Sequence, residues 1–291
     1  MSLRPRARLR AAAAGSIVAL AAGSAVVMGT AQPAAAASLN FDCNVLGNPQ
    51  TFPVDITSSA PAQLPTGSST TPDLTTVVTI PAGLADALRG LLQASSFSGV
   101  IHSTTLVNDV PQAADLTVPQ TGAGAPGTAI PLTATGSLAP ITAGNPGDVT
   151  TLAAGAQDVV MTLVTPGGDQ PLEVLCTPGA DQDLTFGTIT SVKDGSKTAA
   201  KAAYSAKHHA VASSAKVTSA HGIVPASGKV KFVLKRGSTA VGSVTEALND
   251  SGKATAAFTG VRKSGSYTVV ASYKGSDLLK GSKDSAGFTV H

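Results

Sequence analysis

Tryptophan is absent from this 291-residue chain, and aromatic residues of all kinds make up only 3% of it. Nucleobases stack on aromatic side chains, so the composition argues against nucleic-acid binding despite the lysine content. A carbohydrate-cleaving groove needs two carboxylates held across a cleft, and no acidic pair here is framed by rings. We therefore expect neither a nucleic-acid-binding protein nor a glycosidase.

The chain also lacks the short motifs that usually carry catalysis. It has no G-x-S-x-G, no H-E-x-x-H, no glycine-rich phosphate loop with lysine and no calcium loop. Of its five histidines only His208 and His209 are adjacent, and on a strand these two would point to opposite faces. We predict that the protein is not an enzyme and that it has no catalytic residue, no metal and no cofactor. The alternative is a secreted hydrolase or inhibitor whose site lies in the first half of the chain and escapes motif reading.

The first 37 residues predict a secretory signal peptide. Four arginines precede an uncharged apolar stretch from Ala11 to Met28, and the small residues Ala34–Ala37 offer a cleavage site before Ser38. A membrane anchor is the competing reading, but the apolar stretch is rich in Ala and Gly and a cleavage site follows it. We expect a secreted protein, in solution or associated with the cell wall, with no membrane span after cleavage.

Only two cysteines are present, Cys43 and Cys176. Because an exported protein meets an oxidising compartment, we predict a disulfide between them. A nucleophile or a metal ligand would need a nearby base or further ligands, and neither cysteine has one in sequence.

Charge divides the rest of the chain into two parts. Residues 38–190, called the acidic domain, hold 12 acidic side chains and one basic one, a net charge of −11. Residues 191–291 hold 15 basic and 5 acidic side chains, a net charge of +10. We read residues 191–195 as a linker and residues 196–291 as a second unit, the basic module. Such an uneven distribution of charge indicates what each part can bind, and it does not indicate the fold.

Short Val- and Thr-rich runs between turn residues predict an all-β fold with two β-sandwich domains. One stretch of the acidic domain departs from this pattern. In Pro81–Ser95, Leu84, Leu88, Leu91 and Leu92 recur at helical spacing, which predicts one short amphipathic helix packed on the core.

The ends of the acidic domain resemble a known but uncharacterised domain. The opening Leu39–Cys43, with Gly47 and Gln50, and the closing Leu172–Pro178 are similar to a domain of secreted actinomycete proteins. The resemblance implies a source and a disulfide between the two ends, but no chemistry.

The basic module resembles bacterial immunoglobulin-like repeat domains. The residues that carry the resemblance are Pro225–Phe232, Gly252–Thr255 and Gly265–Ser276. It implies an immunoglobulin-like sandwich of about seven strands that acts as a spacer or an adhesive surface. Tyr267 falls where such domains place a tyrosine whose hydroxyl holds a turn.

One strand of the basic module suggests a binding surface. Along Lys229–Lys235 the alternating apolar residues must face the core, which turns the lysines outward. We predict a cationic face that includes Lys229, Lys231, Lys235, Arg236 and Lys274. Its partner would be an anionic cell-wall polymer or an acidic surface, including the acidic domain of another copy through self-association.

Overall fold

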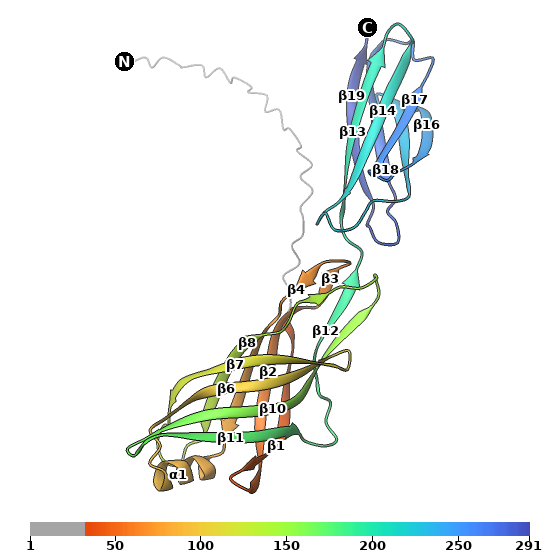
Figure 1. Ribbon diagram of the computed structural model, residues 1–291. Coiled ribbons are helices and arrows are strands. Elements are labelled where there is room, and N and C mark those ends of the chain that lie inside the picture. The colour runs from red at the N-terminus through yellow and green to blue at the C-terminus, as the bar shows by residue number, and fades with distance from the viewer. Residues whose placement is uncertain (1–32) are drawn as a thin grey trace, which may run out of the picture. The chain divides into compact units, whose positions relative to one another are not determined.

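The computed structural model describes residues 33–291, and nearly all of its regular structure is strand (Figure 1). Within these residues there is one helix, so the predicted all-β fold with a short helix in the first half is confirmed. No helix among them is both long and apolar enough to cross a membrane. Most of the predicted signal peptide, residues 1–32, lies outside the described residues, and residues 33–37 form the start of the first strand.

The acidic domain is a sequence of twelve strands and the helix. In chain order these are β1 (Pro33–Val45), β2 (Asn48–Pro61), β3 (Gln63–Pro65), β4 (Ser69–Thr70), β5 (Asp73–Ile80), α1 (Ala82–Leu91), β6 (Ser96–Val107), β7 (Val110–Gly122), β8 (Ile130–Ser137), β9 (Ile141–Thr142), β10 (Val149–Thr165), β11 (Gly168–Pro178) and β12 (Thr185–Val192).

Eight strands of a ten-stranded sheet close on themselves, and β12 and β3 extend this sheet from β10. The order is β11-β1-β2-β5-β8-β7-β6-β10, and β10 pairs with β11 to complete the ring. We had expected a sandwich of two separate sheets; the finding is a barrel-like closed sheet whose interior holds the core. The reason lies in β10, which pairs with β12 through Val149–Ala153 and with β11 through Gln157–Thr165. Register shifts near Ala154 allow this change of partner, and alternation in the sequence carries no sign of it.

Helix α1 covers one end of the closed sheet. Ala85 and Leu88 are buried and Leu84 packs against the core, as the helical spacing predicted. The helix is shorter than expected, because it ends at Leu91, whose side chain is 83% exposed. Arg89, the one basic residue of the acidic domain, donates hydrogen bonds to the carbonyl oxygens of Ala123 and Thr128 and holds the helix against that loop.

The basic module consists of two sheets with seven strands. The first contains β13 (Ser196–Ser205), β14 (Ala210–Ser219) and β17 (Lys253–Phe258); the second has the order β16-β15-β18-β19, with β15 (Lys229–Arg236), β16 (Thr239–Ala247), β18 (Gly265–Tyr273) and β19 (Ser282–Val290). Val211 and Ala254 from one sheet and Phe232 and Val269 from the other belong to one buried core. The two sheets therefore pack face to face.

Some of residues 191–195, the predicted linker, take part in backbone pairing. β12 extends to Val192, and Asp194 forms a bridge with Leu279 in the basic module. Ser191 and Asp194 are 2% and 0% exposed. Only these two of the five residues are buried, and both pair with backbone that is distant in the chain.

Candidate functional site

Three lysines of the predicted cationic face, Lys229, Lys231 and Lys235, lie on strand β15 of the four-stranded sheet. β15 is an inner strand between β16 and β18, with Lys231 opposite Thr245 on one side and Ser272 on the other. Lys283 of β19 lies opposite Ser272, so one row across the sheet reads Thr245, Lys231, Ser272, Lys283. The sequence analysis did not include Lys283, because only the strand register brings it beside β15.

The other lysines of this surface follow from the same register. Val230 pairs with Tyr273, so Lys229, the first residue of β15, lies near Lys274, which follows directly after the end of β18. Lys235 lies opposite Thr268 in a further row. We call the outward surface of this sheet the lysine face; its basic residues are Lys229, Lys231, Lys235, Lys274 and Lys283.

Acidic residues do not share the lysine face. The two acids within these described strands, Glu246 and Asp284, lie opposite the buried residues Val230 and Ala271 and so have the opposite parity. Asp284 also accepts a hydrogen bond from the backbone N–H of Ala200 at the edge of the other sheet. The lysines of the face therefore keep their charge uncompensated by acids on the same surface.

Arg236 does not belong to the lysine face, contrary to our prediction. It has the parity of Phe232 and Leu234, and its guanidinium donates to the carbonyl oxygen of Ser264 at 2.8 Å. It lines a separate groove of about 1140 Å³ together with Arg262 and Lys263. The sequence placed Arg236 in a turn, whereas β15 continues through it and its side chain turns to the end of the sandwich.

The opposite sheet of the basic module also presents lysines. Lys216 lies opposite Lys253, and Lys197 and Lys201 share the same outward side. Both outer surfaces of the module are therefore cationic. The lysine face differs from the other surface in the arrangement of its lysines across adjacent strands, and not in the sign of its charge. This second surface is a natural control for any binding experiment.

A buried aspartate just before the basic module, Asp194, escaped the sequence analysis. We call it and its hydrogen-bond partners Ser219 and His221 the Asp194 cluster. Asp194 accepts hydrogen bonds from the hydroxyl of Ser219 at 2.6 Å and from Nδ1 of His221 at 2.6 Å. Burial by itself would raise the pKa of Asp194, but the hydrogen bonds from Ser219, from His221 and from the backbone of Gly195 outweigh it and hold the pKa below the usual value of 3.8. Since Ser219 bonds the aspartate and not the histidine, the arrangement orders loops rather than activating a nucleophile.

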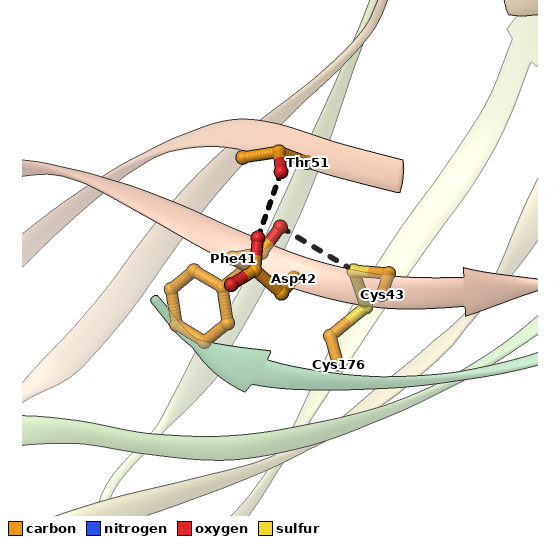
Figure 2. Close-up of a disulfide and its surroundings, with 5 residues drawn as sticks. All are labelled: Phe41, Asp42, Cys43, Thr51 and Cys176. Atoms are coloured by element: carbon orange, nitrogen blue, oxygen red, sulfur yellow. Dashed lines mark hydrogen bonds between the residues drawn. A yellow bond between two sulfur atoms is a disulfide. The ribbon is translucent and has the colours of Figure 1, made fainter. Parts of the chain in front are cut away.

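The predicted disulfide between Cys43 and Cys176 is confirmed (Figure 2). The two residues face each other across β1 and β11, with their Cα atoms 4.0 Å apart. Only three residue pairs join β1 to β11, whereas eleven join β1 to β2. The disulfide therefore reinforces a short seam of the closed sheet, and in the sequence these positions are 133 residues apart.

Residues 40–187 match the family of unknown function DUF6801. The chain belongs to this family. The match confirms the prediction of an uncharacterised domain in the first half of the chain. No curated protein matches the chain.

The DUF6801 match contains the disulfide, the closed sheet and helix α1, and it ends before the basic module begins. The lysine face and the Asp194 cluster therefore lie outside residues 40–187, which the family model matches. Among residues 33–291 no group of three or more His, Cys, Asp or Glu side chains is placed to hold a metal ion. The family description assigns no chemistry to the DUF6801 domain.

Proposed function

We propose that this protein is exported and acts outside the cytoplasm as a binding protein without catalytic activity. The disulfide supports export, since such bonds persist in oxidising compartments. The arginine-rich and then apolar N-terminus supports it from the sequence. In this proposal the DUF6801 domain and the basic module are two extracytoplasmic units, and the second carries the contact to the cell envelope.

The basic module is, in this proposal, an immunoglobulin-like domain of the bacterial type. Its support is the division of seven strands into a sheet of the first, second and fifth and a sheet of the remaining four. A second support is Tyr267, whose hydroxyl donates a hydrogen bond of 2.8 Å to the carbonyl oxygen of Lys263. A tyrosine near the start of a strand that bonds backbone a few residues upstream is a hallmark of this architecture.

The partner we propose for the lysine face is an anionic cell-wall polymer. The observation that carries this proposal is the set of outward lysines on adjacent strands, with no acid on the same face. Residues along a strand on one side are about 7 Å apart and neighbouring strands about 5 Å apart, so the lysines form a two-dimensional array. An extended polymer of repeated anionic groups can contact several of them at once, whereas a single exposed ion pair contributes little.

The test is retention of the full exported protein on purified cell wall at low salt. Replacing Lys229, Lys231 and Lys235 by Ser should weaken retention about tenfold, because three exposed contacts of a few tenths of a kcal/mol each sum to that factor. Retention of the unaltered protein should fall steeply as salt approaches about half-molar. The matched control replaces Lys201, Lys216 and Lys253 by Ser on the opposite sheet, which makes the same change in net charge.

The two triple variants distinguish a specific face from bulk charge. A large loss in the Lys229 set and a small loss in the Lys201 set supports the lysine face. Equal losses would show that only net charge matters, and the face would be abandoned. Concentration-dependent association of the protein without any wall polymer, lost in the Lys229 set alone, would instead identify the acidic domain of another copy as the partner.

A further inference from the structure

The two sides of the basic module's sandwich differ in how far they are closed. On one side, edge strands β13 and β19 are bridged by a hydrogen bond of 2.8 Å from the backbone N–H of Ala200 to Asp284. The hydroxyls of Thr198 and Ser282 lie 2.6 Å apart across the same seam. On the other side, the groove of about 1140 Å³ lies between β16 and β17, which belong to different sheets. This second side is therefore open.

Strand β16, which borders the groove, differs from the other edge strands of the module. All four edges lie within the described residues, and three of them carry lysine: Lys197 and Lys201 in β13, Lys253 in β17 and Lys283 in β19. The nine residues of β16 include no lysine or arginine, and its one charged residue is Glu246. Because lysines on an edge hinder pairing with a further chain, β16 is the edge of this module that is left free to pair.

A β-bulge places an apolar side chain of β16 at the groove. The register between β15 and β16 shifts between Leu234 and Lys235, which leaves Val241 as an extra residue without a partner in β15. Bulges of this kind redirect side chains next to binding sites. Val241 is 52% exposed and lines the groove together with the buried rings of Phe258 and Tyr267. The groove thus offers apolar surface beside a free strand edge.

The charge of the groove has one sign. Of the described residues that line it, the charged ones are Arg236, Arg262 and Lys263, all exposed, and none is acidic. Arg236 donates one hydrogen bond to the carbonyl oxygen of Ser264, and a guanidinium has five N–H donors, so donors remain for a ligand. Arginine binds carboxylates through paired hydrogen bonds. The groove therefore favours an anionic occupant.

We infer that an extended acidic segment of a partner protein binds in this groove as an additional strand beside β16. The free edge of a strand presents a row of N–H and C=O groups, which the backbone of an extended polypeptide matches. Carboxylates at one end of the segment would contact Arg262 and Lys263, and apolar side chains would cover Val241. Glu246 lies toward the other end of β16 and disfavours an acid there. This groove is a different surface from the lysine face, and its proposed occupant does not depend on that face.

Two other occupants match the groove less well. Pairing of β16 with the β16 of a second copy would bring two lysine faces into one continuous sheet, where like charges repel. A polyphosphate or an anionic polysaccharide would neutralise the basic residues, but it has no row of backbone N–H groups for the strand edge. An acidic polypeptide satisfies both the charge and the edge.

The experiment measures binding of fluorescein-labelled peptides to the full exported protein by fluorescence anisotropy. The peptides have nine residues, the length of β16, with valine alternating with glutamate in one half and with threonine in the other. Both orders of the halves are made, because an edge strand accepts a partner in either direction. We expect saturable binding of one order, and about tenfold weaker binding when glutamine replaces glutamate.

Methylated peptides test whether the backbone pairs. N-methylation of every second residue removes the N–H groups along one edge of an extended peptide. Only one edge of an added strand faces β16, so one alternate set of methyl groups should abolish binding and the other set should leave it. This comparison uses the unaltered protein, so it does not depend on the folding of any variant.

Two matched pairs of variants locate the site. Val241→Glu places an acid at the groove and should weaken binding of the peptide about tenfold, whereas Thr245→Glu makes the same change of charge on the outward side of β16 and should have little effect.

The second pair compares the groove with the lysine face. Arg262→Gln with Lys263→Gln should weaken binding about tenfold. Lys229→Gln with Lys231→Gln removes the same charge from the lysine face and should leave peptide binding unchanged.

Several results would overturn the inference. These are no binding of either peptide order, equal binding of the glutamine peptide, equal effects of the two methylated sets, and equal losses within either pair of variants. Saturable binding of polyphosphate with no binding of the peptides would assign the groove to an anionic polymer instead. Dimerisation in sedimentation that Val241→Glu abolishes, again without peptide binding, would assign β16 to a second copy.

Discussion

The two halves of this chain are both built of strands, yet they treat their sheet edges in different ways. In the acidic domain the pairing of β10 with β11 closes eight strands into a ring, so that these strands leave no open edge. The basic module keeps two open sheets, with β16 at one edge and the lysine-bearing β13 and β17 at others. Charged edge strands resist pairing with other chains. Lysines on the edge strands therefore protect the basic module from such pairing, whereas closure of the sheet protects the acidic domain.

The two halves also differ in the bonds that stabilise them. The closed sheet has a disulfide across its three-pair seam between β1 and β11. The basic module has no cysteine, and side chains that hydrogen-bond the backbone hold its loops. The hydroxyls of Tyr267 and Tyr273 donate to the carbonyl oxygens of Lys263 and Ser227, and the carboxylate of Asp194 accepts from the backbone N–H of His221. The first half thus gains stability from a covalent bond and the second from side-chain hydrogen bonds, so substitutions should affect the two halves separately.

Removing the disulfide should have the largest effect, and only on the acidic domain. Cys43→Ala with Cys176→Ala opens a loop of 133 residues, which should lower the free energy of unfolding of that domain by about 5 kcal/mol. Calorimetry should show a lower melting temperature for one transition and an unchanged second transition. Equal shifts of both transitions would mean that the halves do not unfold independently.

A substitution that leaves a cavity in one hydrophobic core should destabilise only the domain that contains that core. Phe41 and Phe232 are 1% and 0% exposed and belong to different core clusters. Phe41→Ala should destabilise the acidic domain and Phe232→Ala the basic module, each by about 3–5 kcal/mol. The check is which calorimetric transition moves; a single variant that shifts both would contradict the separation.

The Asp194 cluster should give the basic module its own dependence on pH. Asp194→Ala removes the buried carboxylate that accepts hydrogen bonds from Ser219 and from His221, and the loss of these bonds to a charged group should cost about 1–3 kcal/mol. Since hydrogen bonds hold the pKa of Asp194 below 3.8 in the folded state, its contribution is present above that value and is lost as pH falls through the lower folded pKa. Acid unfolding of the basic module should therefore be shallower in this variant.

The control for the Asp194 experiment is Asp277→Ala, at an exposed residue of the same module. This variant should keep the stability and the acid profile of the unaltered protein. An identical acid profile for Asp194→Ala and the unaltered protein would show that the buried carboxylate has no part in acid unfolding.

The smallest expected effect concerns one hydroxyl. Tyr267→Phe removes the hydrogen bond to the carbonyl oxygen of Lys263 but keeps the ring, whose centroid lies 5.5 Å from that of Phe288. The basic module should lose about 1 kcal/mol in urea unfolding, with no change in the acidic domain. A variant as stable as the unaltered protein would count against the role of this tyrosine.

Local patterns predicted much of the basic module. The alternation along Lys229–Lys235 indicated which side chains enter the core, and the structure buries Val230, Phe232 and Leu234. Tyr267 was expected to hold a turn, and its hydroxyl bonds the carbonyl oxygen of Lys263. Lys283 and the true position of Arg236 were missed, since they depend on which strands are neighbours and on where β15 ends.

In the acidic domain the same reasoning reached the strands, the helix and the disulfide but not their arrangement. Leu84 and Leu88 face the core as their spacing indicated, whereas Leu91 is exposed because the helix stops there. Gln157 carried no signal in the sequence, since a glutamine in a strand is ordinarily exposed. Its burial follows from the register shift that turns this part of β10 toward the disulfide.

The sequence by itself determined the strand-rich composition, the charge division and the cysteine pair, because these depend on residue type and on periodicity along the chain. The tertiary structure alone decided that the first sheet closes, that Asp194 is buried and that lysines from separate strands share one face. The physical reason is that strand register and partner choice are settled by contacts between segments far apart in the chain, which alternation within one segment does not encode.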